Sequence, residues 1–407
     1  MIAFLYIQFV GGAIVDLFNN NQGCGGFEQG SYDLEAVHPT EVNWTRQSRF
    51  NAPSSLHIVK RLSSSGLFHF TENIGSFVVD RRGRALIAVG DEDERTGKLY
   101  RVNLKEERVE SLFETEGGLL SLALASDHSI LVTASNRLIS LDENGARQWE
   151  ASIEGVPFSR PIISKEGFIY LCTFDSDRII GRLYSFTPEG VEHWVYTCSS
   201  IFWCDPILSK EGIIYIGQNV TSKLCALTKD GNVLWEKKIG QGLGKYPPVI
   251  DSDGVIYWCL SDKLYALDSN GEVKWEYEPE EGPLVFTSPA LSTDGLLYLQ
   301  EVGLKMTCLT KDGQLLWKKN LKGQPFNAPV IGASGELIQS MLIDNSIDGY
   351  SVVELFTPDG DHIDSIEIGG LVESVVLADH GVVYALSAKW TRKMKAEWEL
   401  VVLRAAE

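Results

Sequence analysis

The sequence is poor in positive charge and in histidine. Lys and Arg number 36 against 55 Asp and Glu, which gives a formal net charge of −19, and only 7 histidines occur among 407 residues. Because an acidic surface repels phosphate, nucleic acid and anionic membranes are disfavoured as partners. The histidines are far apart and form neither an HExxH motif nor a Cys/His zinc pattern. We therefore expect no metal site and no cofactor, with a site assembled from remote segments as the open alternative.

Cysteines are few and do not form an obvious paired set. The chain has 7 cysteines, an odd number, and no CxxC motif. An oxidised extracellular domain usually pairs its cysteines, so reduced thiols and a cytoplasmic location are expected.

The sequence also lacks a long uninterrupted apolar run. Its longest apolar stretch, residues 1–18, is interrupted by Gln8 and Asp16, and no Lys or Arg occurs before Arg46. A secretory signal begins with a basic region, and a spanning helix needs about 20 apolar residues. No integral membrane span is therefore expected. If this stretch does act as an export signal, the alternative location is secreted or in the cell envelope.

What the sequence does contain is an internal repeat with a period of 40 to 45 residues. In five copies a Trp follows a Gly by four positions, and a sixth copy, at Gly360, has Asp364 in place of the Trp. Such a period is typical of repeat architectures rather than of several unrelated domains. The five pairs are Gly145 and Trp149, Gly190 and Trp194, Gly231 and Trp235, Gly271 and Trp275, and Gly313 and Trp317.

A second glycine marks another turn in each unit. Gly167, Gly212, Gly254 and Gly295 each follow Asp or Glu and precede a short apolar run that ends in Tyr. Such glycines supply the positive φ values that tight hairpins need. Each unit therefore predicts four short antiparallel strands, which is the blade of a β-propeller.

Counting the units predicts an all-β fold, an eight-bladed β-propeller of four-stranded antiparallel blades. The last blade has only three clear strands, and an N-terminal strand at 56–62 is expected to complete and close it, in preference to residues 41–45. Residues 1–42 are interpreted as a poorly ordered extension or a misannotated start, and residues 43–407 as the propeller. The predicted blades span about 74–113, 118–153, 158–196, 204–238, 247–278, 286–320, 327–368 and 371–404.

The repeat resembles that of the pyrroloquinoline-quinone-like propellers. The resemblance rests on units such as Ala266-Leu-Asp-Ser-Asn-Gly271-Glu-Val-Lys-Trp275 and Asp253-Gly254-Val-Ile-Tyr257, and on the lead-in from Asn43 to Pro53. That superfamily includes the quinoprotein alcohol dehydrogenases and the outer-membrane barrel-assembly lipoprotein of Gram-negative bacteria. The resemblance covers residues 43–404 and implies the fold rather than the function. It also implies a structural docking role between blades for Trp149, Trp194, Trp235, Trp275 and Trp317.

A quinoprotein dehydrogenase is disfavoured within this superfamily. The enzymes that the repeat resembles carry adjacent cysteines and are considerably longer, whereas no two cysteines are adjacent here and no long insertion separates the blades. No catalytic residue is predicted.

The candidate ligand-binding residues lie where the innermost strands begin, because these positions ring the mouth of the central channel. They precede or follow aligned prolines, and their residue types vary strongly against a regular scaffold, which favours a surface shaped for a ligand or partner. The alternative is a water-filled funnel without a specific ligand. The candidates are Arg160, Trp203, Asp205, Tyr246, Ser288 and Asn327.

The sequence thus predicts a non-enzymatic scaffold that recognises a protein or peptide partner through its loops and exposed blade edges. The alternative is a small-ligand receptor or an enzyme with a site at the channel mouth.

Overall fold

The computed structural model describes residues 48–405 with several gaps. The predicted extension at 1–42 and the rival closing strand at 41–45 lie outside the described residues, as does the candidate Trp203. The gaps are residues 49, 64–73, 81, 92–95, 104–107, 158, 176, 203, 219–220, 242–243, 245, 281–287, 326, 345–348 and 391–395.

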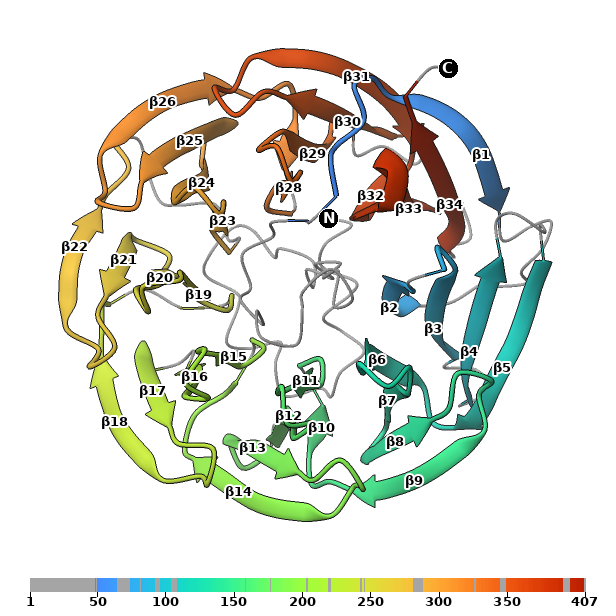
Figure 1. The fold of residues 1–407 in the computed structure, drawn as a ribbon, viewed down its shortest axis with the longest axis vertical. Coiled ribbons are helices and arrows are strands. Elements are labelled where there is room, and N and C mark those ends of the chain that lie inside the picture. Colours follow the sequence, from blue (N-terminus) through green and yellow to red (C-terminus); the bar gives the residue numbers. More distant parts are fainter. Residues whose placement is uncertain are drawn as a thin grey trace.

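Eight antiparallel sheets stand side by side around a central axis (Figure 1). This arrangement confirms the predicted eight-bladed β-propeller. The first three blades are β2 (Ile74–Val79), β3 (Ala85–Asp91), β4 (Thr96–Asn103) and β5 (Arg108–Glu116); β6 (Leu119–Leu124), β7 (Ile130–Ala134), β8 (Arg137–Leu141) and β9 (Arg147–Ser152); and β10 (Val156–Pro157), β11 (Ile162–Ile163), β12 (Ile169–Asp175), β13 (Ile180–Phe186) and β14 (Glu192–Cys198).

Blades 4 to 6 are the most regular. They consist of β15 (Ile207–Leu208), β16 (Ile214–Gln218), β17 (Lys223–Leu227) and β18 (Val233–Lys238); β19 (Val249–Ile250), β20 (Ile256–Cys259), β21 (Leu264–Leu267) and β22 (Val273–Tyr277); and β23 (Ala290–Leu291), β24 (Leu296–Glu301), β25 (Lys305–Thr310) and β26 (Leu315–Asn320).

The last two blades carry the closure of the ring. Blade 7 consists of β27 (Gln324–Pro325), β28 (Val330–Ile331), β29 (Leu337–Leu342), β30 (Tyr350–Phe356) and β31 (His362–Gly369). Blade 8 consists of β32 (Leu371–Ala378), the 3-10 turn η2 (Asp379–Gly381), β33 (Val382–Trp390), β34 (Ala396–Arg404) and β1 (His57–Ser63).

An N-terminal strand closes the ring, as the sequence predicts. β1 pairs antiparallel with β34, with His57 opposite Arg404 and Ser63 opposite Glu399. The outermost strand of blade 8 therefore comes from the start of the propeller and its other three strands from the end. Such pairing leaves no open sheet edge between the first and last blades.

The innermost strands are short because prolines interrupt them. Proline has no backbone N–H and holds the preceding residue in an extended conformation, so it is placed at the start of a strand rather than inside one. In blades 4 to 6 the innermost strand has only two residues. The prolines that directly precede an innermost strand or its second piece are Pro161, Pro206, Pro248, Pro289 and Pro329.

The core lies between the blades. Middle strands such as β7 and β16 are buried along their whole length, while outermost strands such as β18 alternate between exposed and half-buried positions. Strands buried on both faces pack against the blades on either side, so one apolar cluster runs through blades 3 to 6. Within the described residues no helix has the length and hydrophobicity needed to cross a membrane.

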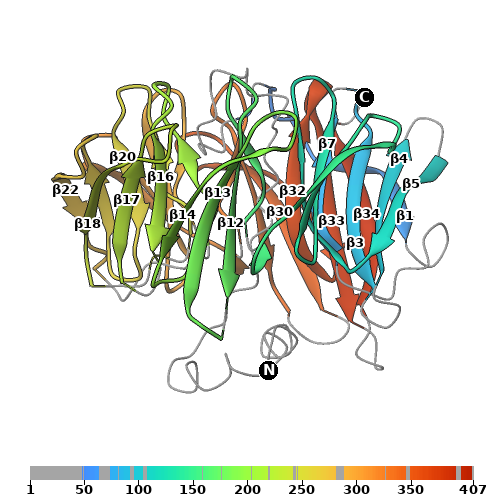
Figure 2. The ribbon, with the colours of Figure 1, turned by 90° about the horizontal axis from the view of Figure 1, so that it is seen from below.

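Because each blade is an up-and-down meander, its turns are divided between two ends of the ring (Figure 2). We call the end that carries the first-to-second and third-to-fourth strand turns the turn face. The opposite end, which carries the second-to-third turns and the links between blades, is the link face.

Candidate functional site

Near the turn face, the repeat tryptophans join neighbouring blades. Each indole N–H donates to a carbonyl in the third-to-fourth strand turn of the next blade, two residues before that turn's glycine. Each ring is half-buried. The donor and acceptor pairs are Trp149 and Pro188 (3.0 Å), Trp194 and Lys229 (2.8 Å), Trp235 and Ser269 (2.9 Å), Trp275 and Lys311 (3.1 Å), and Trp317 and Pro358 (3.2 Å).

The turn glycine is what lets each ring approach. Gly271 has a φ of 75°, and a Cβ added there would lie 2.7 Å from the Trp235 ring. A glycine is therefore required both for the backbone conformation and for the ring contact. The Gly and Trp that recur within one repeat thus make their contacts across repeats, and the turn glycines of blades 3 to 7 each receive the tryptophan of the preceding blade.

At the link face, two candidate residues from neighbouring blades contact each other. The backbone N–H of Arg160 donates to Asp205 Oδ1 at 2.6 Å, and Arg160 Nη2 lies 3.5 Å from Asp205 Oδ2. Both residues are at most 9% exposed. Burial raises the pKa of the Asp205 carboxyl, and the charge and hydrogen bonds of Arg160 act against that rise. This pair joins the start of blade 3 to the start of blade 4.

Two further candidates also bond to neighbouring blades. The Ser288 hydroxyl donates to the Pro247 carbonyl at 3.2 Å, and the Asn327 side-chain amide donates to the Glu373 carbonyl at 2.8 Å. The Asn327 carbonyl in turn accepts from the side chains of two buried glutamines, Gln300 at 2.6 Å and Gln339 at 2.9 Å.

The last described candidate, Tyr246, also has a partner outside the set. Tyr246 lies on the link into blade 5, where its carbonyl accepts a hydrogen bond from the Trp258 indole at 3.0 Å. Among the candidates that the structure describes, Arg160 and Asp205 contact each other directly, and the ligand-binding role of the set stays a prediction.

A carboxyl that the sequence reasoning missed lies on β32. Glu373 is half-buried on this innermost strand, next to a register shift, and desolvation raises the pKa of its carboxyl to about 7. No sequence signal distinguishes Glu373, because its burial depends on which segments the ring brings beside it.

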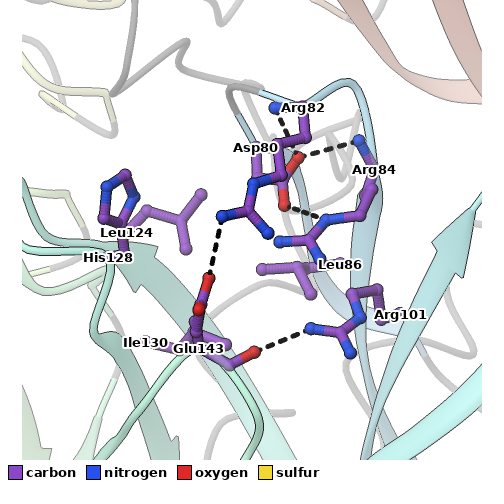
Figure 3. Close-up of a pocket in the computed structure, with 9 residues that line it drawn as sticks. All are labelled: Asp80, Arg82, Arg84, Leu86, Arg101, Leu124, His128, Ile130 and Glu143. Atoms are coloured by element: carbon purple, nitrogen blue, oxygen red, sulfur yellow. Dashed lines mark hydrogen bonds and ion pairs between the residues drawn. The ribbon is translucent and has the colours of Figure 1, made fainter.

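A small pocket opens at the seam between blades 1 and 2, near the turn face (Figure 3). Its volume is about 40 Å³. The sequence reasoning missed this pocket. Aligning blade 1 with the repeat indicates that this seam differs from the others. Arg101 and Glu110 align with Ser140 and Trp149, so an acid stands at a position where a tryptophan recurs. The lining residues are Asp80, Arg82, Arg84, Leu86, Arg101, Leu124, His128, Ile130 and Glu143.

Three buried thiols are not poised for catalysis. Burial raises the pKa of Cys204 and Cys308 to about 12 and that of Cys225 to about 11, which disfavours the reactive thiolate. In the part of the chain that the structure describes, no three or more His, Cys, Asp or Glu side chains gather as a metal site would require. The cysteines that form no disulfide with another described residue are Cys172, Cys198, Cys204, Cys225, Cys259 and Cys308.

Aliphatic side chains are exposed along the outer rim of the ring. Each outermost strand pairs with one described strand only, so its other edge faces outward. The exposed aliphatic residues on these strands are Val59, Val195, Val233, Leu234, Val273, Leu315, Leu316 and Ile363.

Comparison with known proteins identifies the repeat. Residues 181–352 match the family described as outer membrane protein assembly factor BamB. No curated protein matches the sequence.

Solved structures with a similar fold share little sequence with this chain. BamB from Moraxella catarrhalis has a TM-score of 0.59 at 14% identity, with 86% of this chain and 97% of that chain covered. The C-terminal WD40 domain of Sif2 has a TM-score of 0.63 at 12% identity, with 86% and 99% covered. The Dos1 propeller has a TM-score of 0.58 at 10% identity, with 86% and 98% covered. At such identities these likenesses show the propeller fold alone.

Proposed function

Because the chain is a pyrroloquinoline-quinone-like β-propeller repeat protein, we propose that it is a non-enzymatic scaffold that binds a protein or peptide partner. The observation that carries this proposal is the outer rim, where outward strand edges and exposed aliphatic side chains coincide on successive blades. Similar folds that carry an assembly-factor or WD40 name agree with a scaffold. Since propellers also host enzymes, the absence of catalysis is part of the proposal.

The rim suits strand addition. A partner peptide that pairs with an outermost strand gains backbone hydrogen bonds, and its alternate side chains contact the exposed aliphatic residues of that strand. On β18 these are Val233 and Leu234, and on β26 they are Leu315 and Leu316, all 47–51% exposed. Lys237 and Lys319 on the same strands limit unspecific pairing, because charged side chains oppose edge-to-edge association.

Site-specific photocrosslinking in cells tests the proposal. We expect a photoreactive residue at Leu234 or at Leu316 to give a discrete protein adduct, while the same residue at Lys165, an exposed position on the turn face, gives none. Replacing Val233 with Lys should lower the adduct yield from Leu234 at least fivefold. No adduct from either rim position, or equal yields from all three positions, would overturn the rim as the binding surface.

A ligand site on the link face is the second proposal. It is favoured by the half-buried carboxyl of Glu373, whose raised pKa suits a group that exchanges a proton with a ligand. Arg160, Asp205 and Tyr246 are the residues to replace with Ala. A small molecule whose stabilisation of the protein against heat disappears in the triple variant would support a receptor at the channel mouth.

We also propose the cell envelope as the location. The cytoplasmic location expected from the odd cysteine number is not supported by the comparisons, and the matching family is described by its role at the outer membrane. Fractionation of cells that produce the tagged full-length chain tests this. Recovery in the soluble cytoplasmic fraction alone would contradict it.

A further inference from the structure

The seam between blades 1 and 2 lacks the tryptophan that joins the five following seams. Arg101 pairs with Glu110 across β4 and β5 just as Ser140 pairs with Trp149 across β8 and β9, so Glu110 stands at the tryptophan position. Arg101 takes over the missing hydrogen bond: its Nη1 donates to the Glu143 carbonyl at 2.7 Å. That carbonyl belongs to the residue two positions before the turn glycine, the position that the indoles use elsewhere.

The same seam lacks a second ring. In blades 3 to 6 a Tyr three residues after the first turn glycine packs on the tryptophan of its own blade, as Tyr257 does on Trp275 with 5.9 Å between ring centroids. In blade 1 the residue three positions after Gly83 is Leu86. Blade 1 therefore has Leu and Glu where blades 3 to 6 have two aromatic rings.

The seam between blades 7 and 8 shows what replaces such rings. There Ile338 stands in the tyrosine position and Asp364 in the tryptophan position. In the register of β1 with β34, Leu56 occupies the place of the turn glycine, and its N–H donates to Asp364 Oδ2 at 2.7 Å. Leu56 is 3% exposed in one cluster with Ile338, so a leucine on an extended segment fills the volume that the rings vacate.

At the seam between blades 1 and 2, Leu112 packs against the apolar cluster that contains Leu86, Leu124 and Ile130, but it is not among the residues that line the pocket. Gly145 keeps the turn position and lies against Leu112, and the pocket remains beside them. Its floor is apolar and buried: Leu86, Leu124 and Ile130 are 2–7% exposed. A volume of about 40 Å³ is smaller than an aromatic ring needs and suits the end of an aliphatic side chain.

Three arginines, Arg82, Arg84 and Arg101, stand around this floor, and each of them is paired with a carboxylate (Figure 3). Arg84 Nε donates to Asp80 Oδ2 at 2.5 Å, while Arg82 Nη2 lies 3.5 Å from Glu143 Oε2. The Arg82 and Glu143 side chains are 65% and 42% exposed, so their ion pair contributes little and a carboxylate of a ligand can replace Glu143 at small cost.

We propose that this seam pocket binds an extended peptide segment of a partner protein. A leucine-sized aliphatic side chain packs on Leu86, Leu124 and Ile130, and an acidic residue next to it pairs with Arg82. The inference rests on the proposed function in that the ligand is a protein, but it uses a surface apart from the outer rim.

Titration with a defined peptide tests the pocket. The probe is a fluorescein-labelled pentapeptide with a central leucine flanked by two aspartates, and its controls carry glycine for the leucine or lysines for the aspartates. We expect saturable fluorescence polarisation and a shift of the Ile130 δ1-methyl NMR signal, with affinity at least tenfold lower for both control peptides. No saturation up to millimolar peptide, or equal affinity for the lysine-flanked control, would overturn the proposal.

Two variants distinguish a loss of peptide binding at the pocket from a loss of folding. The double variant Glu110→Trp with Leu86→Tyr restores the repeat pattern and should fill the pocket. We expect it to abolish peptide binding and to leave crosslinking at Leu234, on the outer rim, unchanged. Since that double variant could misfold, Arg82→Glu provides a second measurement at a largely exposed side chain. It should weaken the aspartate peptide at least fivefold and improve the lysine peptide. Unchanged peptide binding in Arg82→Glu would overturn the proposed role of Arg82. Loss of crosslinking at the outer rim alone would count against the proposed function and not against the pocket.

Discussion

The Asp364 carboxylate accepts a hydrogen bond from the backbone N–H of Leu56 at 2.7 Å, across 308 positions of sequence. This contact explains why the sixth repeat copy has lost its tryptophan. The five seams from blade 2 to blade 7 set a large ring against a glycine, whereas this seam sets a short acid against a leucine. The larger side chain therefore lies on the opposite side of this seam. The exchange occurs where the N-terminal strand enters blade 8 and closes the ring.

Asp364 should make stability depend on pH in the acid range. The hydrogen bond from Leu56 is the largest of the effects that hold the pKa of Asp364 below its usual value. A carboxyl with a lowered folded pKa stabilises the protein above its unfolded pKa of about 4, and the benefit disappears as the pH falls through the folded pKa. We expect Asp364→Ala to lower the free energy of unfolding by about 1 kcal/mol at pH 7, since the group is only partly buried. Urea unfolding should show this difference shrinking below pH 4.

Asp364→Asn is the matched control. It keeps the size and one acceptor oxygen but cannot titrate, so its stability relative to Asp364→Ala should not change between pH 3 and pH 7. A difference between wild type and Asp364→Ala that stays constant down to pH 2.5 would contradict the assignment.

Two turn glycines allow the ring contact to be measured separately from backbone strain. Gly271 and Gly254 have φ values of 75° and 80°, but only Gly271 faces a ring, that of Trp235, while nothing lies within 4 Å of a Cβ at Gly254. Gly254→Ala should cost about 1 kcal/mol from the left-handed conformation alone. Gly271→Ala should cost a further 1–3 kcal/mol, because the methyl displaces the ring. Urea unfolding of both variants checks the difference, and equal costs would mean that the ring contact contributes nothing.

The number of blades follows from the Gly and Trp spacing, because each ring needs a glycine one period away and the period fixes where strands recur. The closing strand follows from a blade that is one strand short. The contacts of the candidate residues could not be predicted in the same way. Arg160 and Asp205 touch only because the ring sets the starts of two blades side by side, and variation at Ser288 and Asn327 was interpreted as ligand specificity although both bond to neighbouring blades.

A double-mutant cycle measures whether the ion pair between Arg160 and Asp205 stabilises the fold. Removing one member of a buried ion pair leaves the other charge without compensation, so Arg160→Met or Asp205→Leu alone should cost about 3 kcal/mol. Replacing both with apolar residues should restore much of that loss, because no isolated charge remains. Chemical unfolding gives the four free energies. If the double variant loses as much free energy of unfolding as the two single variants together, the two side chains do not stabilise each other.

The buried Cys308 thiol should make the free energy of unfolding fall as the pH rises into the alkaline range. Burial raises the pKa of its thiol to about 12, whereas an unfolded cysteine titrates near pH 8.5. A group whose folded pKa is raised stabilises the folded state fully below the unfolded pKa, and that contribution is lost as the pH rises toward the folded value. The advantage of wild type over Cys308→Ala in urea unfolding should therefore narrow by about 1–2 kcal/mol between pH 8 and pH 10. The same burial predicts that the thiol reacts with a disulfide reagent at pH 8 only after urea unfolds the chain, and rapid reaction in the native protein would contradict this account.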